Sequence, residues 1–156
     1  MKNFDIRERA ERAKAYFQDG YNCSQSVFMA YADLFDLDVE LASKFASSFG
    51  GGMGRMRYVC GAVSGMLMVL GFVFGYTDTE SDTDKLSHYK LVQEKMRQFI
   101  GHFGSVTCSE LIKTKDDNFV PTPRNEEFYK ARPCAKYVWY CAEILQEELA
   151  KQGKIK

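Results

Sequence analysis

Residues 59–76 read VCGAVSGMLMVLGFVFGY, an apolar run of 18 residues that contains no charged side chain. This length is the lower limit for a helix that spans a bilayer. Four glycines, one serine and the lack of a second such segment favour a buried central helix of a folded domain instead. Gly61/Gly65 and Gly71/Gly75 have the small-xxx-small spacing that lets another backbone approach closely, so we expect tight packing against this helix.

The sequence on both sides of this run has helical periodicity. Apolar residues recur at helical spacing along residues 4–20, 22–35, 39–49, 83–103 and 133–151, and a short helix is expected at 107–112. The segment 113–132, with Pro121 and Pro123, is expected to be a loop with about one helical turn. No alternating strand pattern, internal repeat or low-complexity linker is present. The sequence therefore predicts a single all-α domain over residues 1–156, a bundle of six or seven helices around the glycine-rich central helix.

The composition and net charge of the chain exclude several classes of protein. The chain has 21 basic and 21 acidic residues, so its formal net charge is zero, and 46% of its residues are hydrophobic. This balance argues against disorder and against binding to nucleic acid or to an anionic membrane surface. The first 17 residues are charged throughout and lack the apolar core of a signal peptide, so we expect a cytoplasmic protein without a membrane span. The aromatic content of 14% is compatible with a helix-mediated homodimer.

The five cysteines are the main chemical signal in the chain. An odd number of cysteines in a reducing cytosol disfavours a closed set of structural disulfides. No Cys-x-x-Cys pair occurs, so neither a thioredoxin-like motif nor a zinc ribbon is present locally. If the cysteines act together, the fold must bring them together.

Four of the cysteines are expected to open helices. Asn22 with Gln25 forms a helix start that places Cys23 first in its helix. Thr107 and Glu110 have the spacing of a capping box, which places Cys108 first in the next such helix. The other two are Cys134, which follows Pro133, and Cys60, which starts the central helix.

A cysteine at a helix N-terminus is favoured as a thiolate by the helix dipole and the free N–H groups. Arg55 and Arg57 before Cys60, and Arg132 before Cys134, should lower the thiol pKa further. Cys141 lies two turns beyond Cys134, about 10.5 Å along the same helix, which is too far for a disulfide. We therefore expect Cys141 to be a core residue. Each cysteine also has a plainer interpretation as a small buried hydrophobic residue.

Three stretches carry a resemblance to a known family: GYNCSQ at 20–25, FGGGMGR at 49–55 and CGAVSG at 60–65. They resemble the C_GCAxxG_C_C family of small domains, named for four cysteines and a C-G-A-x-x-G core. The third and fourth family cysteines resemble Cys108 in FGSVTCSEL and Cys134 in RPCAKYV. The resemblance runs from about residue 15 to 145 and leaves Cys141 outside the pattern. It implies a redox-active protein.

Three functions remain open. The first is a dithiol/disulfide protein that needs no cofactor, with Cys60 as nucleophile and Cys23 or Cys134 as the resolving thiol, acting on a redox partner or small molecule. The second is a zinc or iron–sulfur site held by all four helix-opening cysteines, Cys23, Cys60, Cys108 and Cys134. The third is a ligand- or partner-binding module with structural cysteines, in which Gly51, Gly52, Gly54 and Arg55 cradle an anion at the start of the central helix.

Overall fold

The computed structural model describes residues 8–155, and over that range it contains eight α-helices and no strand. The helices are α1 (Arg9–Gln18), α2 (Cys23–Met29), α3 (Val39–Ala46), α4 (Gly61–Phe74), α5 (Asp82–Phe103), α6 (Cys108–Leu111), α7 (Glu126–Ala131) and α8 (Cys134–Lys151). Two 3₁₀ helices, η2 (Ala32–Phe35) and η3 (Ser47–Phe49), complete them. The predicted all-α fold is confirmed.

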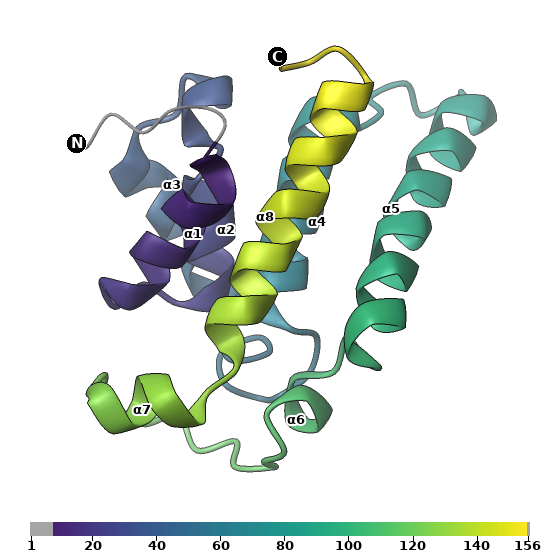
Figure 1. The fold of residues 1–156 in the computed structure, drawn as a ribbon. Coiled ribbons are helices and arrows are strands. Elements are labelled where there is room, and N and C mark those ends of the chain that lie inside the picture. The colour runs from purple at the N-terminus through teal and green to yellow at the C-terminus, as the bar shows by residue number, and fades with distance from the viewer. Residues whose placement is uncertain (1–7, 156) are drawn as a thin grey trace.

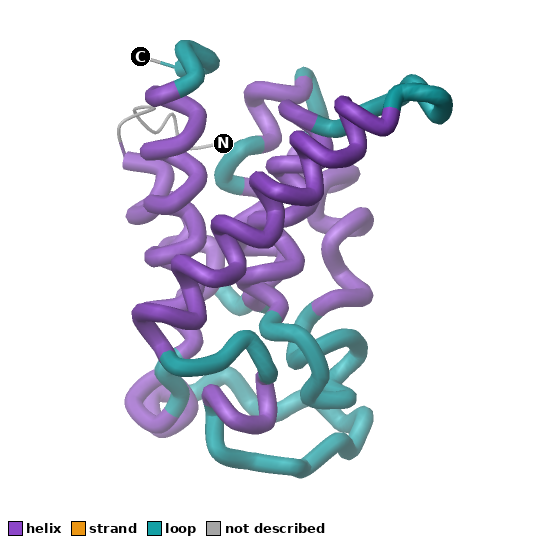
Figure 2. Tube along the Cα trace, turned by 90° about the vertical axis from the view of Figure 1, so that its right-hand side faces the viewer, coloured by secondary structure: helices purple, strands orange, loops and turns teal. Residues whose placement is uncertain are grey.

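Helices α4 and α8 occupy the middle of the bundle, with α1, α2 and α3 on one side and α5 on the other (Figure 1). Helix α2 contacts α1, α3, α4 and α8, so it is packed on several sides. The short helices α6 and α7 lie at the end of the bundle opposite the C-terminus (Figure 1). Figure 2 shows that long loops gather at the same end. This end therefore contains much of the irregular backbone, where functional side chains are commonly found.

Helix α4 meets α2 through its glycines. A Cβ added at Gly65 would lie 2.7 Å from the carbonyl oxygen of Ser24, and one added at Gly61 would lie 3.1 Å from Cys23 Cβ. The close approach predicted for this pair is confirmed. The same prediction is wrong for the second pair, because a Cβ at Gly71 would meet nothing within 4 Å and Gly75 lies just beyond the helix end.

The apolar segment is a helix buried mainly along its first half. Residues of α4 from Gly61 to Met66 are buried, whereas Phe72 near its end is 59% exposed. Among the described residues, no helix combines the length and the apolar character needed to cross a membrane. The burial of its first half agrees with the interpretation of this segment as part of the core.

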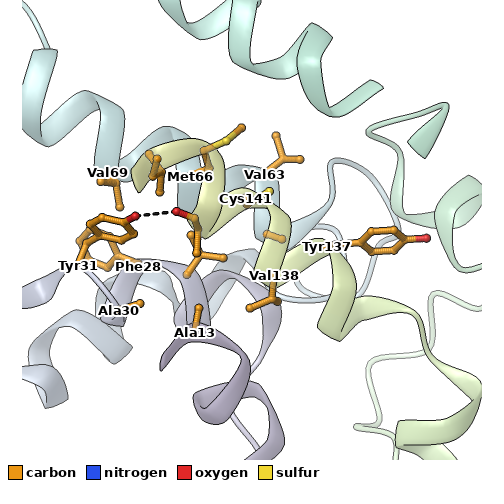
Figure 3. Close-up of a cluster of buried hydrophobic side chains, with 14 of the residues drawn as sticks. Ala13, Phe28, Ala30, Tyr31, Val63, Met66, Val69, Tyr137, Val138 and Cys141 are labelled. Atoms are coloured by element: carbon orange, nitrogen blue, oxygen red, sulfur yellow. Dashed lines mark hydrogen bonds between the residues drawn. The ribbon is translucent and has the colours of Figure 1, made fainter. Parts of the chain in front are cut away.

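The core joins α1, α2, α4 and α8 (Figure 3). Tyr31 is fully buried in it, and its hydroxyl donates a 2.7 Å hydrogen bond to the carbonyl oxygen of Ala142. Cys141 lies in the same cluster with Val63, Met66 and other apolar side chains, and it is fully buried.

One segment differs from the sequence prediction, and another agrees with it. The helix expected over 22–35 ends at Met29 and continues as the 3₁₀ helix η2, which Asp36 ends in a left-handed conformation. The predicted loop 113–132 contains α7, which Asn125 caps by accepting a hydrogen bond from the Phe128 N–H. Phe4, predicted to begin the first helix, lies outside the described residues.

Candidate functional site

Four cysteines from four distant parts of the chain line one cavity of about 430 Å³. They are Cys23, Cys60, Cys108 and Cys134, and we call this space the cysteine cavity. It lies where the N-termini of α2, α4, α6 and α8 meet. Among the lining residues that the structure describes, the cysteine thiols are the groups that become strong nucleophiles when deprotonated.

Cys23 is the first residue of α2, as predicted. The Asn22 side chain accepts a hydrogen bond from the Gln25 N–H at 2.9 Å, and the Asn22 N–H donates to Gln25 Oε1 at 3.0 Å. This capping box fixes the first turn of the helix and with it the Cys23 side chain.

The other three cysteines of the cavity also lie at helix starts, as predicted, but the local geometry differs from the prediction. Cys108 and Cys134 are the first residues of α6 and α8, whereas Cys60 is the residue before α4. The capping box predicted at Thr107 is not formed, because Glu110 accepts its hydrogen bond from the Ser105 hydroxyl, which in turn accepts from the Thr107 N–H.

The glycine-rich loop, residues 50–57, lies against the segment that contains Cys108 and leads into Cys60. Residues 51–55 all have positive φ, and so does Arg57. At Gly52 (φ 74°) an added Cβ would lie 2.7 Å from Cys108 Cβ, so glycine is required both by the conformation and by the space. The Cys60 N–H donates to the Val106 carbonyl at 2.7 Å and the Cys108 N–H to the Tyr58 carbonyl at 2.6 Å. These two bonds hold the chain around Cys60 beside the chain around Cys108.

The thiols of Cys23 and Cys134 shift each other's pKa. The hydrogen-bonding interaction from the Cys23 thiol lowers the pKa of Cys134, and nearby Arg132 acts in the same direction against the effect of burial. The same interaction raises the pKa of Cys23 well above its ordinary value, and burial adds to this. The pair therefore holds its first negative charge on Cys134 and keeps a proton on Cys23.

The prediction that Cys60 has a lowered thiol pKa is wrong. Burial, followed by the neighbouring Cys23, raises the pKa of Cys60 to about 12, although backbone N–H groups of Ala62 and Val63 oppose this. Burial also raises the pKa of Cys108, although Arg57 donates to its sulfur at 3.8 Å. A helix N-terminus and preceding arginines favour a thiolate, but desolvation of a 4% exposed residue such as Cys60 outweighs them.

Arginines from three segments surround the cavity: Arg55 and Arg57 from the glycine-rich loop, Arg124 before α7, and Arg132 before α8. The Arg55 guanidinium donates to the carbonyl oxygens of Asn118 and Val120, so it fastens the 113–125 loop over the cavity. Arg124 stacks over the ring of Phe17 at 4.5 Å and acts to lower the pKa of Cys23. Sequence reasoning missed Arg124, which no local pattern distinguishes from other loop arginines.

Of the residues predicted to cradle an anion, Gly51, Gly54 and Arg55 line the cavity, whereas Gly52 is not part of the lining. The polar groups of Gly54 and Arg55 have other partners, however. The N–H groups of Gly54, Arg55 and Arg57 donate to carbonyls of residues 48–51 within the same turn, and the Arg55 side chain holds the distant loop.

Cys141 stays apart from the cavity lining and lies in the core, where burial raises its pKa well above the ordinary value. Across residues 8–155, no three His, Cys, Asp or Glu side chains are grouped as a metal ion would require. The four thiols of the cavity thus share a space but do not converge on a common centre in this conformation.

Tyr137 links the two helices that present the third and fourth cysteines. Its hydroxyl donates to the Leu111 carbonyl at 3.0 Å, which ties α8 to α6 beside the cavity. The site is therefore held by backbone and side-chain bonds from segments far apart in sequence.

Comparison with known protein families finds a match. Residues 21–148 match the family described as "Putative redox-active protein (C_GCAxxG_C_C)". No curated protein and no solved structure matches the chain. The matched segment contains every cysteine of the cavity and the glycine-rich loop between them. The chain belongs to the C_GCAxxG_C_C family.

Proposed function

We propose that the protein is a dithiol/disulfide redox protein in which Cys134 is the nucleophile and Cys23 the resolving thiol. The observation that carries the proposal is that these two thiols share the cysteine cavity and shift each other's pKa, which is lowered at Cys134 and raised at Cys23. A thiolate is the attacking species in thiol–disulfide exchange, and a protonated neighbour keeps it in place until the second step.

The reaction proceeds in two displacements. The Cys134 thiolate attacks one sulfur of a substrate disulfide, its S–S bond breaks, and the first substrate thiolate leaves while a mixed disulfide forms on Cys134. The proton of Cys23 passes to that thiolate. The Cys23 thiolate then attacks the Cys134 sulfur and releases the second substrate thiolate. The substrate disulfide gains two electrons and the protein dithiol loses two.

Cys60 and Cys108 have a different place in this proposal. Their raised pKa values leave them protonated near neutral pH, and both line the cavity beside the reacting pair. We propose that they line the site and do not react in the first turnover.

Thiol counting in single-cysteine variants tests the assignment. The wild-type protein treated anaerobically with one equivalent of a disulfide should lose two thiols and regain them with reductant. Cys60→Ala, Cys108→Ala and the core control Cys141→Ala should behave in the same way. Cys23→Ala should instead retain a mixed disulfide on Cys134, and Cys134→Ala should lose no thiol rapidly.

Metal analysis of the same anaerobic sample provides an independent check. Zinc or iron bound at about one equivalent and released by thiol modification would overturn the dithiol assignment and make the cysteines ligands. Far-ultraviolet circular dichroism of each variant separates a lost thiol from a lost fold.

A further inference from the structure

The cysteine cavity is strongly cationic. Arg55, Arg57, Arg124 and Arg132 line it, and the lining residues that the structure describes include no aspartate or glutamate. The nearby Asp116 lies outside this lining, and its side chain accepts a hydrogen bond from the Asn118 N–H. Four positive charges therefore surround the thiols, although the net charge of the chain is zero.

Arg57 is the least accessible of these arginines, with 5% of its surface exposed. Its Nε donates to the Asp116 carbonyl at 2.7 Å and its Nη1 to Cys108 Sγ at 3.8 Å. Its Nη2 is buried and has no hydrogen-bond partner. A buried guanidinium nitrogen without an acceptor is costly, because desolvation is not offset by a new bond. Arg57 is a lining residue of the cysteine cavity, so this unpaired donor belongs to a side chain that a bound ligand can contact.

The backbone that holds Arg57 is also strained. Its φ of 66° lies in the left-handed region, as do those of Met53 and Arg55, and this conformation is unfavourable for a residue other than glycine. The fold therefore maintains two unfavourable features at Arg57, a left-handed backbone and an unpaired buried donor, next to Cys108 in the cavity that also contains the thiol pair. Strain of this kind is typical of ligand-binding sites.

We propose that the substrate of the cysteine cavity is a small organic disulfide that carries a carboxylate, and that Arg57 Nη2 binds this carboxylate. This inference rests on the proposed dithiol function and names the class of its substrate. Arg124 and Arg132 supply the surrounding positive charge, while Arg55 is occupied by the loop over the cavity. A cavity of about 430 Å³ has the size of a small-molecule site.

A charge series of disulfides tests the inference directly. Dithiodipropionate, hydroxyethyl disulfide and cystamine are similar in size and carry negative, zero and positive charge. The dianion should oxidise the Cys23/Cys134 pair about tenfold faster than the neutral compound, which is the effect of one charge-assisted hydrogen bond, and cystamine should be slowest. Arg57→Gln should remove the preference for the dianion. Arg97→Gln, which removes the same charge from the exposed face of α5, should retain it.

A second arm needs neither a variant nor the oxidation of the thiol pair. Iodoacetate and iodoacetamide differ in charge but little in size, and their competition at Cys134 is read by peptide mapping. The ratio of carboxymethyl to carbamidomethyl product at Cys134 should be about tenfold higher in the folded protein than in urea. An equal or lower ratio in the folded protein, or equal rates for the three disulfides, would overturn the inference. Failure of every disulfide to oxidise the pair, with the iodoacetate preference intact, would overturn the proposed function alone.

Discussion

Two glycines of the same helix should respond to the same substitution with opposite signs. Gly65 and Gly71 both lie inside α4, and neither has a positive φ. A Cβ at Gly65 would lie 2.7 Å from the Ser24 carbonyl oxygen and 3.0 Å from Val27 Cβ, both on α2. A Cβ at Gly71 would enter open space. Gly65→Ala should therefore force α2 and α4 apart, whereas Gly71→Ala should not.

The expected magnitudes follow from two opposing terms. Replacing glycine by alanine in a helix stabilises it by about 0.8–1 kcal/mol in either variant. Overpacking costs about 1–3 kcal/mol and applies only to Gly65→Ala, where the obstacle is backbone and cannot rotate away. The free energy of unfolding should therefore rise slightly in Gly71→Ala, and should lie about 1–3 kcal/mol lower in Gly65→Ala than in Gly71→Ala. For a domain of this size each kcal/mol changes the melting temperature by roughly 2–4 °C.

Urea unfolding followed by far-ultraviolet circular dichroism measures both variants against the wild-type protein. Because Cys23 opens α2, Gly65→Ala should also change the rate at which Cys134 is alkylated, and Gly71→Ala should leave it unchanged. Equal stabilities for the two variants, or a more stable Gly65→Ala, would refute the close approach of α2 and α4.

Three further predictions concern ionisable groups. Cys23→Ala removes the donor that lowers the pKa of Cys134, so the pH profile of Cys134 alkylation should move to higher pH and the alkylation rate at pH 7 should fall about tenfold. An unchanged profile in this variant, or the same loss of rate in Cys141→Ala, would contradict the pairing. Lys95 pairs with the 3% exposed Glu148 at 2.7 Å, so Lys95→Met should cost about 3 kcal/mol in chemical denaturation, and Lys95→Met with Glu148→Leu should recover most of it. Burial alone would raise the pKa of Glu148, but the hydrogen bond from Lys95 lowers this pKa overall, so the pair stabilises the fold fully above pH about 4.5 and loses this contribution as the pH falls below that value. In Glu148→Gln the free energy of unfolding should therefore depend less on pH in the acid range, and an unchanged dependence would exclude this role.

Local signals in the sequence predicted the helix starts well. The Asn22 and Gln25 capping box is formed, and Cys23, Cys108 and Cys134 each occupy the first position of a helix. These features depend on residues within one turn of each other, so they can be read without the fold. The same reasoning failed at Thr107, because the Ser105 hydroxyl competes for Glu110.

The properties of the site could not be predicted in the same way. Cys60 was expected to be the nucleophile on the strength of its neighbours, but its pKa depends on burial among segments distant in sequence. The thiols of Cys23 and Cys134 interact although the two residues lie far apart in the sequence. Likewise, Gly71 has the spacing of a packing glycine, and only the fold shows that no helix faces it.

The most direct test of the central claim is the identity of the first disulfide that forms in the wild-type protein. One equivalent of hydroxyethyl disulfide is added anaerobically, free thiols are alkylated, and the oxidised peptides are mapped by mass spectrometry without reduction. We predict one intramolecular disulfide between Cys23 and Cys134, with Cys60, Cys108 and Cys141 alkylated only after unfolding. A first disulfide that joins Cys60 to any other cysteine, or the absence of an intramolecular disulfide, would contradict it.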